Sequence, residues 1–103
     1  MRATLIEILR QLNQAEAEMD REDEKGLELP EVEFRLRDHW TVRQARTNVA
    51  RAMGLLLKNR MIQLVPGGVY SWTRQRNVGR LYRITADGKA FLLQSSQSRD
   101  RIA

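Results

Sequence analysis

Residues 41–58 read TVRQARTNVARAMGLLLK, a stretch in which apolar side chains recur every three or four residues. The recurring apolar positions are Val42, Ala45, Val49, Ala52, Met53, Leu56 and Leu57. This spacing predicts a helix with one buried stripe, and Thr41 is a natural N-cap for it. The opposite side of this helix is polar and cationic.

Two further helices are predicted before residue 41. Residues 1–19 carry an apolar pattern of helical period and predict an N-terminal helix. The acidic residues 20–28 predict a solvated loop. Residues 29–40 fit either a helix or a strand, because their apolar positions satisfy both periods. We expect a short helix there, since it would precede residues 41–58 as the first half of a helix pair.

The chain after residue 58 predicts strands and a final helix. Residues 61–65, 69–73 and 81–84 are β-prone, and the last two runs could pair across a tip at residues 74–80. Pro66, Gly67 and Gly68 predict a turn or bulge between the first two runs. Thr85 is expected to cap a helix that ends near residue 94, and residues 95–103 have the composition of a disordered tail.

These elements resemble the winged helix-turn-helix regulators of the MarR and PadR kind. The string Leu81-Tyr82-Arg83-Ile84-Thr85-Ala86-Asp87-Gly88-Lys89 is similar to the return strand and helix start of that family. Asn59-Arg60-Met61-Ile62 stands where such proteins often have Lys-Gly-Leu-Ile, so the glycine is missing at Arg60. The resemblance implies an α+β, mainly α fold: one winged-helix domain over residues 1–94 with a two- or three-stranded antiparallel wing.

Charge is divided unevenly along the chain. Residues 1–38 hold 11 acidic and 6 basic side chains, a balance of −5, whereas residues 39–103 hold 2 acidic and 12 basic ones, a balance of +10. No acidic residue lies between Asp38 and Asp87. Such asymmetry is typical of a chain that presents one face to nucleic acid.

The sequence therefore predicts two contacts with double-stranded DNA. Helix 41–58 would enter the major groove, where early helix residues contact base edges. The residues expected there are Thr41, Arg43, Gln44, Arg46, Thr47, Asn48 and Arg51. The wing would meet the minor groove or the backbone through Arg74, Gln75, Arg76, Asn77 and Arg80. About six phosphate contacts would make log affinity fall with log salt at a slope near −5.

A homodimer is also expected, because symmetric dimers match palindromic operators. The N-terminal helix is apolar over a wide arc, part of which could contact a second copy. The expected dimer contacts are Leu5, Ile6, Ile8, Leu9, Leu12, Phe91 and Leu92.

Other functions fit the sequence less well. The same fold could serve as a protein-interaction module, and Tyr70, Trp72 and Tyr82 could stack bases in an RNA or single-strand binder. No residue pattern predicts an enzyme, a cofactor, a metal site or a small-molecule ligand, and no apolar run is long enough for a membrane span. The expected function is a transcriptional regulator in the cytoplasm, associated with the nucleoid.

Overall fold

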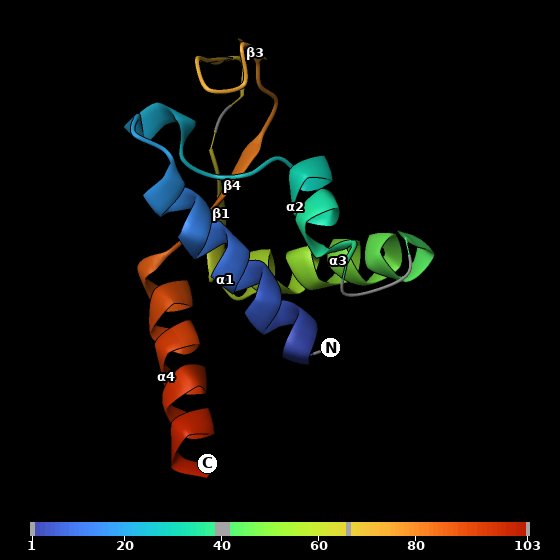
Figure 1. Cartoon of the computed structure of the whole chain (residues 1–103), viewed down its shortest axis with the longest axis vertical. Coiled ribbons are helices and arrows are strands. Elements are labelled where there is room, and N and C mark those ends of the chain that lie inside the picture. The colour runs from blue at the N-terminus through green and yellow to red at the C-terminus, as the bar shows by residue number, and fades with distance from the viewer. Residues whose placement is uncertain (1, 39–41, 66, 103) are drawn as a thin grey trace.

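The computed structural model describes the backbone of residues 2–38, 42–65 and 67–102, and the side chains of residues 3–38, 47–65 and 67–95. Within that part, helices dominate and two small antiparallel sheets complete an α+β fold (Figure 1), which confirms the predicted class. The elements are α1 (Arg2–Glu18), the 3-10 helix η1 (Glu22–Glu24), α2 (Leu29–Leu36), α3 (Val42–Lys58), β1 (Ile62–Val65), β2 (Tyr70–Ser71), β3 (Arg76–Asn77), β4 (Leu81–Ile84) and α4 (Ala86–Ile102).

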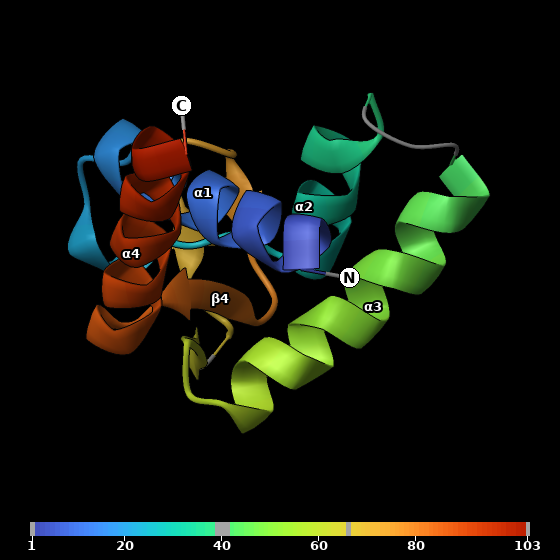
Figure 2. The same cartoon turned by 90° about the horizontal axis from the view of Figure 1, so that it is seen from below.

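Helix α1 lies at the centre of the domain. It packs against α2, α3, α4 and β4, and Figure 2 shows it surrounded by the other three helices. Its periodic apolar side chains belong to one core, to which α2, α3, α4, β1 and β4 also contribute side chains. The fully or nearly buried members of that core include Ile8, Leu9, Leu12, Leu27, Val32, Leu36, Val49, Ala52, Met53, Leu56, Ile62 and Ile84.

Helix α2 settles the ambiguity at residues 29–40 in favour of the predicted helix, at least as far as Leu36. Its start is a capping box: the Glu28 side chain accepts from the backbone N–H of Glu31, and the Glu28 N–H donates to Glu31 Oε1 at 2.8 Å. Pro30 lies in the first turn, where its missing N–H removes no helical hydrogen bond. The strand-like alternation is overridden because Val32 and Leu36, four residues apart, are both buried.

Helix α3 buries the predicted stripe. Its described members Val49, Ala52, Met53 and Leu56 are 3% exposed or less. The helix ends in a Schellman motif, in which Met61 N–H donates to Leu56 O at 2.9 Å and Arg60 N–H to Leu57 O at 3.1 Å. Arg60 occupies the left-handed position of this motif with φ +59°, so the missing glycine changes the residue and not the path of the chain.

The strands form one long hairpin whose pairing differs from the expectation. β1 pairs with β4, with Ile62 opposite Ile84, and β2 pairs with β3, with Tyr70 opposite Asn77. The tip is therefore residues 72–75, and Gln75 adopts a positive φ of +57° there. Residues 81–84 pair with β1 because Ile62 and Ile84 must both reach the core. Leu27 adds a third, one-residue partner by exchanging two hydrogen bonds with Tyr82.

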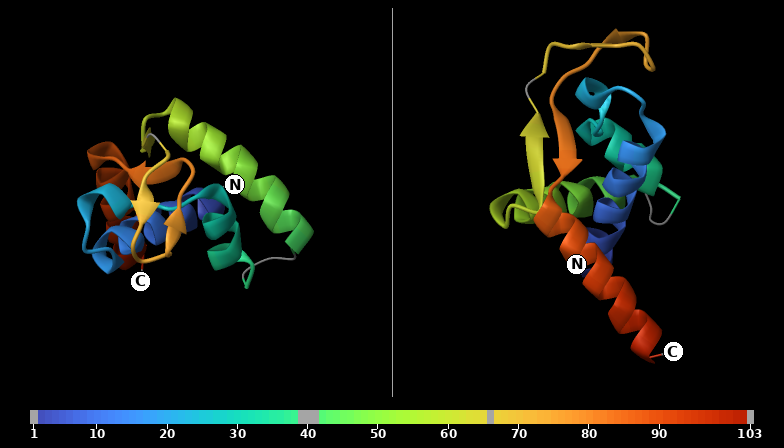
Figure 3. Two further views of the ribbon diagram at one scale, coloured as in Figure 1. Left: turned by 90° about the horizontal axis from the view of Figure 1, so that it is seen from above. Right: turned by 90° about the vertical axis from the view of Figure 1, so that its left-hand side faces the viewer.

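Helix α4 begins at the predicted cap. Thr85 Oγ1 accepts from Gly88 N–H at 3.1 Å, and the same hydroxyl donates to Arg60 O at 2.7 Å. The backbone of α4 continues to Ile102, beyond residue 94, where the sequence predicted a disordered tail. No glycine or proline follows Gly88 to interrupt the helix. Figure 3 shows its far end reaching away from the other elements. In the described part of the chain, no helix combines the length and apolarity that crossing a membrane requires.

Candidate nucleic-acid interface

The solvent face of α3 is the first part of the candidate interface. Side chains that share the side opposite the core stripe are exposed, and the described ones are Thr47, Ala50, Arg51, Gly54, Leu55 and Lys58. Asn48 lies at the edge and is half-buried. The predicted contacts Thr41, Arg43, Gln44 and Arg46 lie outside the described side chains. Thr47 and Arg51, four residues apart, follow one another along the helix surface.

Ion pairs divide the cations of the domain into two groups. Carboxylates of α1, η1, α2 and the α2 N-cap Glu28 form ion pairs with Arg35, Arg74, Arg76, Arg83 and Lys89. Among the described side chains of the basic half, four exposed cations have no described carboxylate within 4.0 Å: Arg51, Lys58, Arg60 and Arg80. Positive charge that the fold leaves uncompensated therefore gathers on α3, on the turn that follows it and on the return arm of the hairpin.

The structure corrects the expectation for Arg74. Its side chain is only 7% exposed, and its Nε and Nη2 donate to the two carboxylate oxygens of Glu31 at 2.8 and 2.9 Å. Nη2 also donates to Gly26 O at 3.0 Å. A guanidinium with these partners joins the hairpin tip to α2 and does not project toward a duplex.

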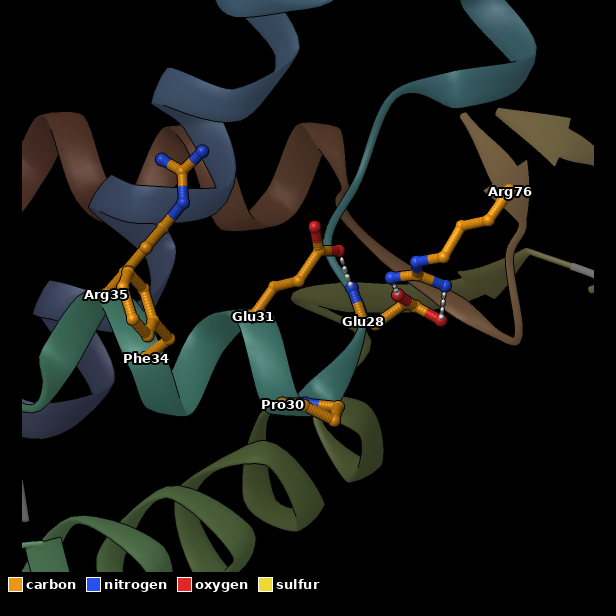
Figure 4. A pocket seen from close by; sticks show the side chains of 6 residues that line it. All are labelled: Glu28, Pro30, Glu31, Phe34, Arg35 and Arg76. Atoms are coloured by element: carbon orange, nitrogen blue, oxygen red, sulfur yellow. Dashed lines mark hydrogen bonds and ion pairs between the residues drawn. The ribbon is translucent and has the colours of Figure 1, made fainter. Parts of the chain in front are cut away.

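Arg76 is also engaged, although its side chain is 51% exposed. Its guanidinium forms an ion pair with Glu28 at the start of α2, and Glu28 Oε2 also accepts from Gly79 N–H at 2.9 Å. This guanidinium holds the pKa of Glu28 below its ordinary value, and the Gly79 N–H adds to the effect although burial opposes it. Figure 4 shows this pair at one end of an open groove between α2 and the hairpin, whose other lining residues include Pro30 and Phe34.

The remaining predicted wing residues are exposed. Gln75 lies in the tip, Asn77 lies in β3 opposite Tyr70, and Arg80 lies just before β4. Of the three predicted wing arginines, Arg80 is the one that the described carboxylates leave unpaired. The tip itself lies at one end of the molecule, while α3 crosses its middle with α2 between them (Figure 1).

The acidic residues 20–28 are only partly solvated: residues 20–23 are exposed, as the sequence predicted, whereas Glu24 and Leu27 are buried. Glu24 is 2% exposed; it accepts from the N–H groups of Trp72 and Thr73 and from the Thr73 hydroxyl at 3.1 Å. Burial by itself raises the pKa of Glu24, but these donors outweigh it and hold the pKa below its ordinary value. The segment therefore fixes the position of the hairpin tip through the hydrogen bonds of Glu24.

The expected dimer contacts are used inside the domain. Ile6, Ile8, Leu9, Leu12 and Leu92 are between 0% and 9% exposed within a single chain. Leu5 and Phe91 are half-buried and pack against the same core. The wide apolar arc of α1 is explained by its central position, where helices and a strand cover it on several sides. The homodimer stays a prediction, which sedimentation checks by a mass above 12.0 kDa.

Sequence reasoning missed the carboxylates that receive the hairpin. Glu24, Glu28 and Glu31 lie 43 to 51 residues from the groups that they bind. Neither periodicity nor a local motif connects positions so far apart. The one available signal was the charge balance, because an acidic segment and an arginine-rich tip in one small domain have opposite charge.

The described residues contain no group of three or more histidine, aspartate and glutamate side chains that could hold a metal ion. The chain matches none of the family models, none of the curated proteins and none of the solved structures with which it was compared.

Proposed function

We propose that this domain is a winged helix-turn-helix transcriptional regulator that binds double-stranded DNA through α3. The order α1, Leu27, α2, α3 and the β1–β4 hairpin supports that architecture. One observation supports the function: described carboxylates pair with Arg74, Arg76 and Arg83, whereas the exposed cations described on and beside α3 have no described carboxylate partner. A surface of this kind attracts a phosphate backbone.

In this proposal α3 reads the major groove. Arg43 would donate to guanine O6 and N7, Gln44 or Asn48 would pair with adenine, and Arg51 would contact the phosphate backbone. Thr47 would pack on a thymine methyl group or bind a phosphate, and Arg46 would bind phosphate. The small exposed residues Ala50 and Gly54 suit this role, because short side chains let a groove wall approach the helix closely.

In this proposal the wing makes fewer contacts with the DNA backbone than the sequence suggested. With Arg74 and Arg76 held by carboxylates, Arg80 is the wing cation left for the backbone. About four phosphate contacts then remain, so log affinity should fall with log salt at a slope near −3.6 rather than −5.

The test is duplex binding measured by fluorescence anisotropy over a range of salt concentrations. Arg51→Ala should reduce the magnitude of the slope by about 0.9 and weaken binding about fivefold at 0.15 M salt. Arg10→Ala is the matched control, because it removes the same charge from an exposed position on α1. Equal losses in the two variants, or a wild-type slope near zero, would refute the proposal. Selection from a random duplex pool would then identify the preferred site.

A further inference from the structure

The hairpin presents two aromatic side chains to solvent, Trp72 in its tip and Tyr70 in β2. Trp72 is 62% exposed and Tyr70 is 42% exposed, and neither belongs to the hydrophobic core. Their ring centroids lie 5.0 Å apart with the ring planes at 79°, so the two rings form a corner. Tyr82, the third aromatic residue of the hairpin, packs against the core instead.

The backbone that carries this corner is held in place. The Glu24 carboxylate accepts hydrogen bonds from the backbone N–H groups of Trp72 and Thr73. The side chain of Arg74, the next residue of the tip, donates to Glu31 and to the Gly26 carbonyl oxygen. A partner that binds the two rings would therefore not have to order the loop first. Preorganisation of this kind lowers the entropy lost on association.

The surroundings of Trp72 indicate the chemistry of that partner. The Arg21 guanidinium lies 5.3 Å from the centroid of the Trp72 ring, so the ring already accepts a planar cation. Arg21 belongs to an acidic stretch in which Asp20 and Asp23 are exposed, and no described cation pairs with either carboxylate. These carboxylates attract cations and repel phosphates.

We propose that Tyr70, Trp72, Asp20 and Asp23 form a docking surface for an arginine-rich segment of another protein. An incoming guanidinium takes the place of Arg21 over the Trp72 ring, and the two aspartates receive the neighbouring cations of the segment. Arg21 is then an internal occupant of the site that the partner displaces. The surface lies at the end of the long axis, away from α3, so DNA and the partner can be bound together (Figures 1 and 3).

The experiment measures anisotropy of a fluorescein-labelled nona-arginine peptide titrated with the full chain. Trp72→Ala should weaken binding about fivefold, which is what a stacked guanidinium contributes. Arg21→Ala should strengthen binding more than Arg10→Ala does, because only the former removes a competing cation from the ring. Asp20→Asn with Asp23→Asn should weaken binding more than Glu33→Gln with Asp87→Asn, which removes the same charge elsewhere. Circular dichroism of each variant checks that it is folded.

Three results would overturn this inference. The first is peptide binding that Trp72→Ala leaves unchanged. The second is preferential binding of a single-stranded oligonucleotide that Trp72→Ala and Arg21→Ala both weaken, since that pattern indicates base stacking. The third is self-association in sedimentation that Trp72→Ala abolishes, with no binding of the peptide. Each is independent of duplex binding through α3, so the two proposals fail separately.

Discussion

Replacing Gly88 with alanine should destabilise the domain by about 2–3 kcal/mol. A Cβ at this position would overlap the Met61 carbonyl oxygen and lie 2.8 Å from Ile84 Cγ1 and 3.1 Å from the Met61 carbonyl carbon. Carbon atoms normally approach to about 3.5–4.0 Å, so the start of α4 would have to move by about 1 Å.

That movement acts on the hydrogen bonds that attach α4 to the turn after α3. Thr85 N–H donates to Met61 O at 3.0 Å, and the Thr85 hydroxyl donates to Arg60 O at 2.7 Å. Overpacking costs about 1–3 kcal/mol and each weakened hydrogen bond about 1 kcal/mol. The higher helix propensity of alanine offsets about 1 kcal/mol of this loss.

Urea unfolding followed by circular dichroism measures the change. Gly54→Ala is the matched control, because it makes the same substitution inside a helix where a Cβ would meet no atom within 4 Å. The control should gain up to about 1 kcal/mol from helix propensity alone. If Gly88→Ala proved as stable as Gly54→Ala, the proposed close approach between α4 and residue 61 would be refuted.

Three further predictions concern the turn after α3 and the contacts of the hairpin with Glu24, Glu28 and Glu31. Arg60→Gly should raise the free energy of unfolding by about 0.5–1 kcal/mol, because glycine adopts the positive φ without the cost that arginine bears; an unchanged or lower midpoint in urea would contradict this. Arg74→Ala should lower the free energy of unfolding by about 2–3 kcal/mol, since it removes the charged hydrogen bonds from the buried side of the tip. Arg76→Ala removes an exposed side chain and should lower it much less. Equal losses of stability in the two variants would show that burial does not distinguish the two arginines. The lowered pKa values of Glu24 and Glu28 favour the ionised carboxylates in the folded state, so their contribution to stability is present above pH 4.5 and is lost as the pH falls through the lowered values. Thermal melts from pH 6 to pH 3 should show this loss, and Glu24→Gln should reduce its size; an equally steep pH profile in that variant would exclude Glu24 as a source.

The stability measurement on Arg74→Ala also tests the proposed function, when duplex affinity is measured on the same variant. A residue that contributes to stability and leaves duplex affinity per folded molecule unchanged belongs to the scaffold. A residue such as Arg51, at an exposed position, should show the reverse pattern. Measuring unfolding and binding on the same variants therefore separates the two groups of cations that the ion pairs define.

Features that depend on neighbouring residues were predictable from the sequence. The buried stripe of α3 follows from apolar side chains three and four residues apart, and the cap at Thr85 depends on a hydroxyl three residues before Gly88. Residues 29–40 fitted two periods in the sequence, and in the structure the burial of Val32 and Leu36 and the capping box of Glu28 and Glu31 favour the helix. The charge asymmetry was likewise a property of composition alone.

The partners of the arginines came from the folded chain. Arg74 looked like a free cation because no acidic residue is near it in sequence, yet the fold brings it to Glu31, 43 residues away. The same holds for the hairpin register, which the shared burial of Ile62 and Ile84 sets, and for α1, whose apolar arc is covered by its own domain.

Local periodicity and capping thus specify which segments are helices, since those interactions span only a few residues. Which surface stays charged depends on contacts between distant segments. A cation attracts an external anion strongly only where the folded chain places no carboxylate beside it. For this protein that distinction shifts the expected DNA contact toward α3 and leaves exposed aromatic side chains on the hairpin, where Arg21 of the acidic segment contacts Trp72.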